Sequence, residues 1–142
     1  MASANFTNLP RHLAKGDLDF DTATFKVLLI SSVPSEANLD AWVYRSDVTT
    51  EITGTGYTAG GIAQALTLAA IDTTNNRQAV TYTDITNGWT TATFSAVGAI
   101  IYKDTGNSAT DILLHMIDFG GTVSCTAGTY SITYSAPFYI NR

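Results

Sequence analysis

Apolar and β-branched residues along this chain gather in short runs that are separated by Gly, Asn, Asp, Ser and Thr. This spacing is typical of β-strands. Residues 129–135 show it most plainly, because Ser and Thr alternate there with large apolar side chains, which predicts a strand with one buried and one wet face. Further strands are predicted at 24–31, 62–71, 78–85, 89–94, 96–103 and 111–119. Seven or eight short strands indicate an all-β fold, an antiparallel β-sandwich with a jelly-roll-like arrangement.

The segments between these runs carry turn-forming residues. Asn87-Gly88 lies between two predicted strands and favours a two-residue type I′ hairpin. Residues 73–76 and 104–108 join other pairs of runs and also tolerate turn geometry. We therefore expect an antiparallel meander with short loops.

Three of the predicted strands, 24–31, 96–103 and 111–119, are apolar on both faces. A strand of this kind is covered on both sides in the folded protein. The cover can be a second sheet, a helix or a neighbouring subunit, and the pattern alone leaves these three possibilities open.

Two segments near the N-terminus favour helix. In residues 7–15, Thr7 or Asn8 can serve as N-cap, Pro10 stands near the first turn, and Gly16 follows as a stop. Residues 35–45 place apolar side chains at helical spacing after a possible cap. We expect one or two short helices ahead of the strands.

Composition narrows the class of protein. The chain has 142 residues, 45% of them hydrophobic and 13% charged, with a net charge of −5 and a sequence pI of about 4.6. One domain is expected over 1–142, with 1–16 as an N-terminal arm or short helix and 17–142 as the β-sandwich. The seven basic residues are scattered, which argues against nucleic acid as a partner.

Nothing in the sequence resembles a signal peptide or a membrane-spanning helix, so we expect synthesis in a cytoplasm and no membrane partner. The single cysteine, Cys125, cannot form a disulfide within the chain.

Two short strings formally match ligand-binding loops. Residues 54–59, GTGYTA, fit the glycine pattern of a dinucleotide loop, but neither a buried parallel strand before them nor a helix after them is predicted. We interpret the string as a tight loop that packs Tyr57 against the sheet. Residues 17–21 resemble the start of a Ca²⁺ loop, yet Thr22 and Leu28 stand where Gly and Glu are required. A solvated acidic edge with Leu18 and Phe20 turned inward is the preferred interpretation.

The residues that most often carry catalysis or metals are few. His12 and His115 are the only histidines, and with Cys125 they do not show the spacing of a zinc site. His115 lies in an apolar strand and is expected to be a hydrogen-bonded core or interface residue. An enzyme would require a cleft that joins His115, Cys125 and a carboxylate. We expect no catalytic residues, no cofactor and no metal.

Low charge combined with abundant apolar residues favours association with other chains. Aromatic and apolar residues near the termini and around the second helix are the candidate contacts. The candidate interface residues are Phe6, Leu9, Trp42, Tyr44, Phe138 and Tyr139.

Four strings, taken in order, resemble small virion proteins of tailed bacteriophages over roughly residues 15–135. They are 15–19 (KGDLD) leading to 25–29 (FKVLL), 54–61 (GTGYTAGG), 100–106 (IIYKDTG) and 116–120 (MIDFG). The resemblance implies a structural role, because small all-β proteins of this group include capsid decoration or cement proteins that sit as dimers or trimers on the shell. It implies the major capsid protein, or another virion protein, as partner and the virion surface as location.

Two alternatives remain at this point. A head–tail junction or tail component would share the fold and the virion but occur in few copies. A host-surface or carbohydrate-binding module would instead use exposed aromatic side chains as stacking platforms. The aromatic residues considered for that role are Trp42, Tyr44, Trp89 and Tyr139.

Overall fold

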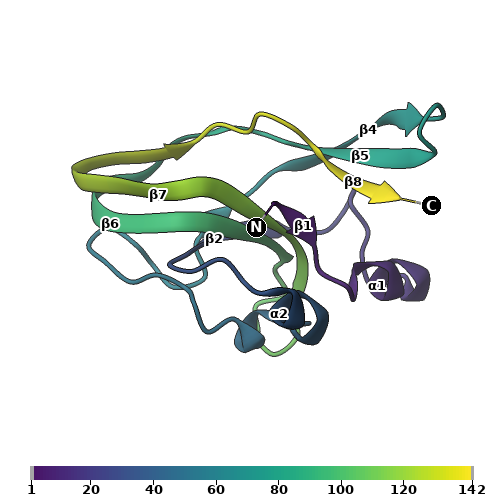
Figure 1. Cartoon of the computed structure of the whole chain (residues 1–142), viewed down its shortest axis with the longest axis horizontal. Coiled ribbons are helices and arrows are strands. Elements are labelled where there is room, and N and C mark those ends of the chain that lie inside the picture. Colours follow the sequence, from purple (N-terminus) through teal and green to yellow (C-terminus); the bar gives the residue numbers. More distant parts are fainter. Residues whose placement is uncertain (1, 142) are drawn as a thin grey trace.

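The computed structural model describes residues 2–141. Strands account for 50% of the chain and helices for 11%, which confirms the predicted all-β, sandwich-like class. The strands form two antiparallel sheets, one five-stranded with the order β1-β7-β6-β2-β3 and one three-stranded with the order β4-β5-β8 (Figure 1). The strands are β1 (Ala4–Asn5), β2 (Phe25–Ile30), β3 (Ile62–Ala63), β4 (Leu66–Asp72), β5 (Arg77–Tyr82), β6 (Ile85–Lys103), β7 (Ile112–Ile132) and β8 (Phe138–Asn141). The helices are α1 (Leu9–Lys15), α2 (Glu36–Ala41) and the 3-10 helix η1 (Arg45–Asp47).

Strands β6 and β7 pair along nearly their whole length and fold back on themselves as one two-stranded ribbon (Figure 1). Four predicted strands therefore correspond to only two strands in the structure. Residues 89–94 and 96–103 belong to β6, and residues 111–119 and 129–135 belong largely to β7. The ribbon bends where the register shifts between Ala96 and Gly98, opposite the extra residues 119–122 of β7. Gly98 is required at this place, since a Cβ there would lie 2.4 Å from the Ile117 carbonyl oxygen.

The predicted hairpin at Asn87-Gly88 is wrong. Asn87 does adopt a positive φ of 56°, but it lies inside β6, where the register against β7 shifts between Ile85 and Trp89. The chain passes from β5 into β6 without reversing, so these two strands lie in different sheets and the simple meander is interrupted. The other two turns are confirmed: 73–76 closes the β4·β5 hairpin and 104–108 lies between β6 and β7.

Both predicted helices are present. Asn8 is the N-cap of α1, and Gly16 ends the helix in the left-handed conformation with φ 76°. Ser35 caps α2, because its side chain accepts a hydrogen bond from the Asn38 N–H, and the helix ends at Trp42. Neither α-helix is long or apolar enough to cross a bilayer within the described chain.

The five-stranded sheet is covered on both faces by the chain itself. On one face, the returning arm of the ribbon places Trp89, Phe94 and Tyr130 against Val27 and Ile101. On the other face, α2 and the N-terminal segment contribute a second cluster, whose members are Phe6, Leu28, Ile30, Leu39, Trp42, Ile100, Tyr102, Leu113 and Met116. A third cluster joins α1 to β5 and β8 through Leu9, Leu18, Phe25, Val80, Ile112, Leu114 and Phe138. The returning arm of the ribbon and helix α2 therefore cover the strands for which the sequence did not specify a cover.

Candidate functional site

Four of the six predicted interface residues are core residues of this chain. The exposed fractions of Phe6, Leu9, Trp42 and Phe138 are 0%, 1%, 8% and 2%. Because α1, α2 and β8 use these side chains to cover the sheets, little of their surface is left for a partner. The expectation that they form an interface is corrected on this ground.

Tyr44 and Tyr139 are half-buried and lie on different elements. The ring of Tyr44 meets the ring of His12 edge-on, with centroids 6.1 Å apart. The Arg77 guanidinium carbon lies 3.6 Å from the centroid of the Tyr139 ring and occupies one face of that ring.

The aromatic platform considered for carbohydrate does not form from the residues named for it. Trp42 and Trp89 are 8% and 3% exposed, and both pack in the core. Tyr139 has one face covered by Arg77. Stacking on a sugar requires an open ring face, so Trp42 and Trp89 cannot contribute to the expected platform.

His115 is a hydrogen-bonded core residue, one of the two environments predicted for it, and it lies between the two sheets. Its Nδ1 lies 2.7 Å from Asn5 Oδ1, and its ring stacks on Phe138 with centroids 4.9 Å apart. Burial lowers the pKa of His115 to about 4, so the ring is neutral at physiological pH. Its ring contacts are with Tyr82 and Phe138, whereas Cys125 lies ten residues further along β7, opposite Phe94.

His12 and the acidic segment 17–21 pair with one another. His12 Nδ1 lies 2.9 Å from Asp17 Oδ2, and Lys15 Nζ lies 3.3 Å from the same oxygen. The hydrogen bonds from His12 and Lys15 lower the pKa of Asp17. Asp19 accepts hydrogen bonds from the Asp21 N–H and the Thr22 hydroxyl. Among residues 2–141 no cluster of three His, Cys, Asp or Glu side chains is placed to hold a metal ion.

Leu18 is buried and Phe20 half-buried within the third cluster, which confirms that these two side chains of the acidic segment turn inward. The carboxylates of the segment therefore face its own neighbours and solvent.

The glycine-rich string at 54–61 is a loop that holds Tyr57 over the sheet, as predicted. The Tyr57 ring packs against Trp89 and Phe94. Its hydroxyl donates to Glu51 Oε1 at 2.8 Å and accepts from the Leu29 N–H at 3.1 Å. Burial raises the pKa of Tyr57. Strand β3 follows instead of a helix, so the geometry of a dinucleotide loop is missing.

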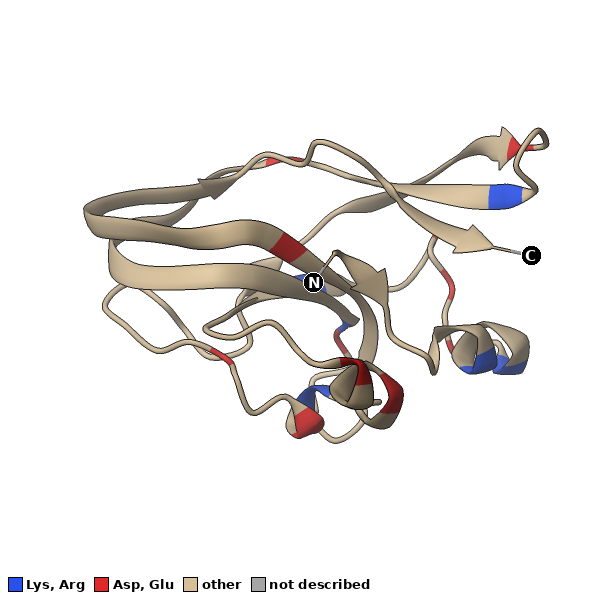
Figure 2. Cartoon of the chain, viewed as in Figure 1, with Lys and Arg blue, Asp and Glu red and all other residues tan. Residues whose placement is uncertain are grey.

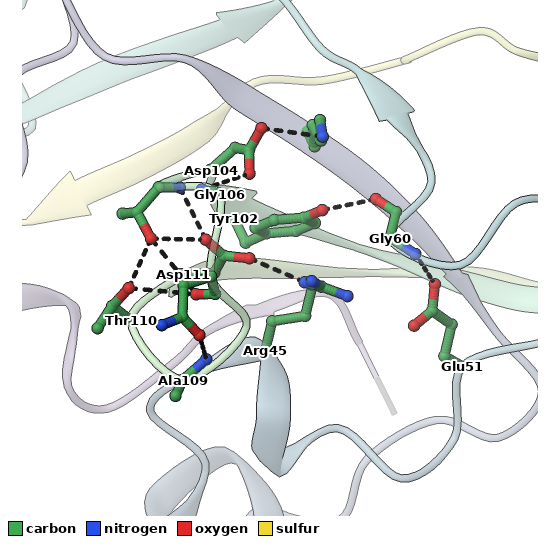
Figure 3. A network of polar contacts seen from close by, with 12 residues as sticks. Arg45, Glu51, Gly60, Tyr102, Asp104, Gly106, Ala109, Thr110 and Asp111 are labelled. Carbon is green, nitrogen blue, oxygen red and sulfur yellow. Dashed lines mark hydrogen bonds and ion pairs between the residues drawn. The ribbon is translucent and has the colours of Figure 1, made fainter.

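A polar network anchors the loops at one end of the five-stranded sheet (Figure 3). Asp111, fully buried, accepts from Arg45 Nε at 2.9 Å and from the Thr105 N–H and hydroxyl at 2.7 and 2.9 Å. Burial by itself would raise the pKa of Asp111, but the hydrogen bonds from Arg45 and Thr105 outweigh it and lower the pKa. Tyr102 Oη donates to the Gly60 carbonyl at 2.6 Å. Both oxygens of the Asp111 carboxylate are engaged, so this network holds loops in place.

Strand β4 presents the most open apolar surface of the described chain. Ile71 is 71% exposed and Leu68 41% exposed. The strand pairs with β5 on one side only, so its outer edge faces away from the sheet. Asp72 and Arg77 are the only charged residues of the β4·β5 hairpin, and they pair with each other at 2.9 Å near its tip, where Figure 2 shows one acidic and one basic patch.

An apolar edge strand with unpaired backbone groups is a template for association with another chain. The apolar run 62–71 predicts a strand but does not distinguish Leu68 or Ile71 from the other residues of the run. Every position of this run is apolar or small except Gln64 and Thr67, so no alternation marked an outward face.

Comparisons with protein-family models, with curated proteins and with solved structures find no match to this chain.

Proposed function

We propose that this chain is a non-enzymatic structural protein of a bacteriophage virion that binds the outside of the capsid and reinforces the junctions between capsomers. The observation that carries the proposal is the apolar edge of β4, where Leu68 and Ile71 are exposed beside an unpaired strand edge and the one charged residue, Asp72, is paired with Arg77. The four sequence strings that resemble small phage virion proteins supply the biological setting.

The contact at β4 would involve two kinds of interaction. The outer edge offers backbone N–H and C=O groups to a strand of the partner. Ile71 and Leu68 add apolar area, which stabilises a complex by roughly 25 cal/mol for each Å² removed from water. Asp72 and Arg77 neutralise each other, so the hairpin brings no unpaired charge to the contact.

The mechanism is passive. A dimer or trimer would bind several capsid subunits at once, and the second and third contacts then form at high effective concentration. Because such an oligomer binds only the intact shell, mass action would shift the equilibrium toward that shell. The partner is the major capsid protein, or another virion protein if the chain lies at the head–tail junction or in the tail.

Copy number per particle tests the location. Quantitative mass spectrometry of purified particles from the source gives the ratio of this chain to the major capsid protein. Hundreds of copies support a position on the capsid lattice. A handful, in multiples of three or six, moves the protein to the neck or tail, and absence from particles contradicts a virion role.

Heating tests the reinforcement. Particles that lack this protein should release their genome at a lower temperature than complete particles, and equal heat resistance would overturn the cement mechanism. Adding back the wild-type chain should restore resistance, whereas Ile71→Arg should fail to bind. Thr129→Arg, at an exposed polar position of β7, is the matched control and should bind normally.

A further inference from the structure

A hollow of about 390 Å³ opens between the two layers of the sandwich, on the side of β7. Its volume lies within the range of about 300–1,000 Å³ that is usual for small-molecule sites. Strand β7 lines it twice, with His115 and residues 117–119 before the bend and Tyr130–Ile132 after it, because the ribbon folds back over this space. Tyr82 of β5 and the segment 133–137 complete the wall.

Aromatic rings form a large part of this wall. Tyr82 and Tyr134 stack with ring centroids 4.4 Å apart and an interplanar angle of 22°. Phe119 and Tyr130 also line the hollow, and Phe119 is partly exposed. Rings of this kind bind the apolar face of a ligand by stacking and by excluding water from it.

His115 supplies a hydrogen-bond acceptor whose orientation is fixed. The Asn5 amide donates through Nδ2 to the Tyr139 carbonyl at 2.8 Å, which turns its Oδ1 toward His115 Nδ1. Nδ1 of the neutral ring therefore carries the proton, and Nε2 keeps a free lone pair. Among the described residues Nε2 has no hydrogen-bond partner, and His115 lines both this hollow and a neighbouring one of about 260 Å³.

Hydroxyl groups surround the aromatic rings. Ser3, Ser131, Thr133 and Ser135 line the hollow. In addition, the buried hydroxyls of Tyr82 and Tyr130, two lining residues, have no hydrogen-bond partner within the described chain. A buried hydroxyl without a partner costs about 1–3 kcal/mol, so the site favours an occupant that can donate and accept hydrogen bonds.

The charges of the hollow exclude several classes of ligand. Among residues 2–141, Asp118 is the only charged side chain that lines it, and the Asp118 carboxylate accepts from the Gly120 N–H at 2.8 Å. Since the described residues of the wall include no Lys or Arg, they offer a phosphate or carboxylate no counter-charge. A purely apolar ligand would leave the hydroxyls and His115 Nε2 unpaired.

We propose that this hollow is a binding site for a neutral saccharide, whose ring stacks on the aromatic wall while its hydroxyls bond to His115 Nε2 and the surrounding hydroxyl groups. A sugar ring combines an apolar face with a rim of donors and acceptors, which is the combination that this wall presents. The site lies apart from the β4 edge and does not depend on the proposed virion role.

Saturation-transfer-difference NMR of the full chain tests the proposal. The probes are glucose, galactose, mannose and N-acetylglucosamine and their disaccharides, each at millimolar concentration. We expect saturation transfer to the ring protons of at least one sugar, with amide shifts at 117–119 and 130–135 in the labelled protein. Absence of transfer from every sugar overturns the proposal.

Three variants locate the binding. Val123→Arg places a long cationic side chain at a 44% exposed position of the wall and should weaken sugar binding at least tenfold. Ile71→Arg makes the same change on β4, outside the hollow, and should leave sugar binding unchanged. His115→Phe keeps a ring against Phe138 but removes the acceptor, and should also weaken binding at least tenfold.

Two results would overturn the assignment even if a ligand binds. Equal sugar affinity in Val123→Arg and the wild type would place the sugar elsewhere on the surface. Binding of tetramethylammonium in the hollow with no sugar binding would mean that the aromatic wall is a cage for a cation.

Discussion

Strands β2 and β4 are both short and mainly apolar, yet they have opposite environments. β2 lies inside the five-stranded sheet with β6 on one side and β3 on the other, and five of its six residues are buried. β4 pairs only with β5, and Ile71 on it is 71% exposed. The difference lies in what covers them. β2 receives a helix layer on one face and the returning β6·β7 ribbon on the other, whereas β4 lies at the margin of the smaller sheet. Apolar composition therefore identifies a strand but does not say whether its cover comes from the same chain.

The largest effect is expected from truncation in the five-stranded sheet. Ile100→Ala removes a fully buried side chain and should lower the free energy of unfolding by about 2–5 kcal/mol. Chemical denaturation followed by tryptophan fluorescence measures the loss. A change below about 1 kcal/mol would contradict the description of β6 as a strand packed on both faces.

Lowering the pH tests the contact between the two sheets, where the ring of His115 stacks on the ring of Phe138. The folded chain has a pKa of about 4 at His115 and the unfolded chain the ordinary 6.5, so the unfolded state binds the extra proton. The contribution of the neutral ring to the free energy of unfolding is fully present above pH 6.5 and is lost as the pH falls toward 4. It amounts to roughly 3 kcal/mol.

In the variant His115→Gln this part of the pH dependence should disappear. The free energy of unfolding of both proteins, measured between pH 4 and 7, gives the difference directly. Parallel curves would mean that His115 titrates normally in the folded protein.

A smaller, local effect is expected at the tip of the β4·β5 hairpin. The hydrogen bonds from Asn75 and then Arg77 lower the pKa of Asp72 from 3.8 to about 2. The ionised carboxylate therefore supports the hairpin above pH 3.8, and this support is lost as the pH falls through about 2. Amide hydrogen exchange of β4 and β5 should accelerate in Asp72→Asn at neutral pH. Amides of β2 serve as the internal control and should be unaffected.

The smallest effect on stability is expected for Ile71→Ala on the exposed edge. Its free energy of unfolding should stay within about 0.5 kcal/mol of the wild type, because the side chain makes few contacts in the folded chain. Sedimentation velocity of the two proteins at the same concentration tests association separately. A loss of stability as large as that of Ile100→Ala would mean that β4 is covered within the folded chain.

Local patterns of the sequence were sufficient for most of the individual elements. The caps around α1, the spacing around Leu39 and the turn at 73–76 all depend on residues that lie close together in the chain. The inward position of Leu18 and the buried state of His115 also followed from neighbouring residues. These features are governed by interactions of short range in sequence.

The long-range arrangement could not be predicted in the same way. Asn87 carries the backbone conformation that its type suggests, but whether a positive φ closes a hairpin or forms an irregularity within a strand depends on the partner strand. Four of the six predicted contact residues, which are Phe6, Leu9, Trp42 and Phe138, were placed wrongly for a related reason. An aromatic side chain near a terminus has the same sequence pattern whether it covers its own sheet, as Phe138 does, or another chain. The hollow at His115 also could not be predicted from the sequence, because it forms only when β7 folds back over itself.

The bend in the β6·β7 ribbon also has a kinetic consequence. The ribbon closes over the short connection between Lys103 and Ile112, and hairpins of this kind form within about 1–10 μs. Pairing of β2 with β6 requires the whole segment between Ile30 and Gly98 to be looped out, which slows this later step. The part of the ribbon beyond the bend pairs with β2, and the returning part packs over that sheet as the opposite layer of the sandwich. Because one ribbon contributes to both layers, neither layer can be completed while the other is absent. We therefore expect folding without a long-lived half-formed sandwich, with a single exponential phase for both layers in stopped-flow refolding.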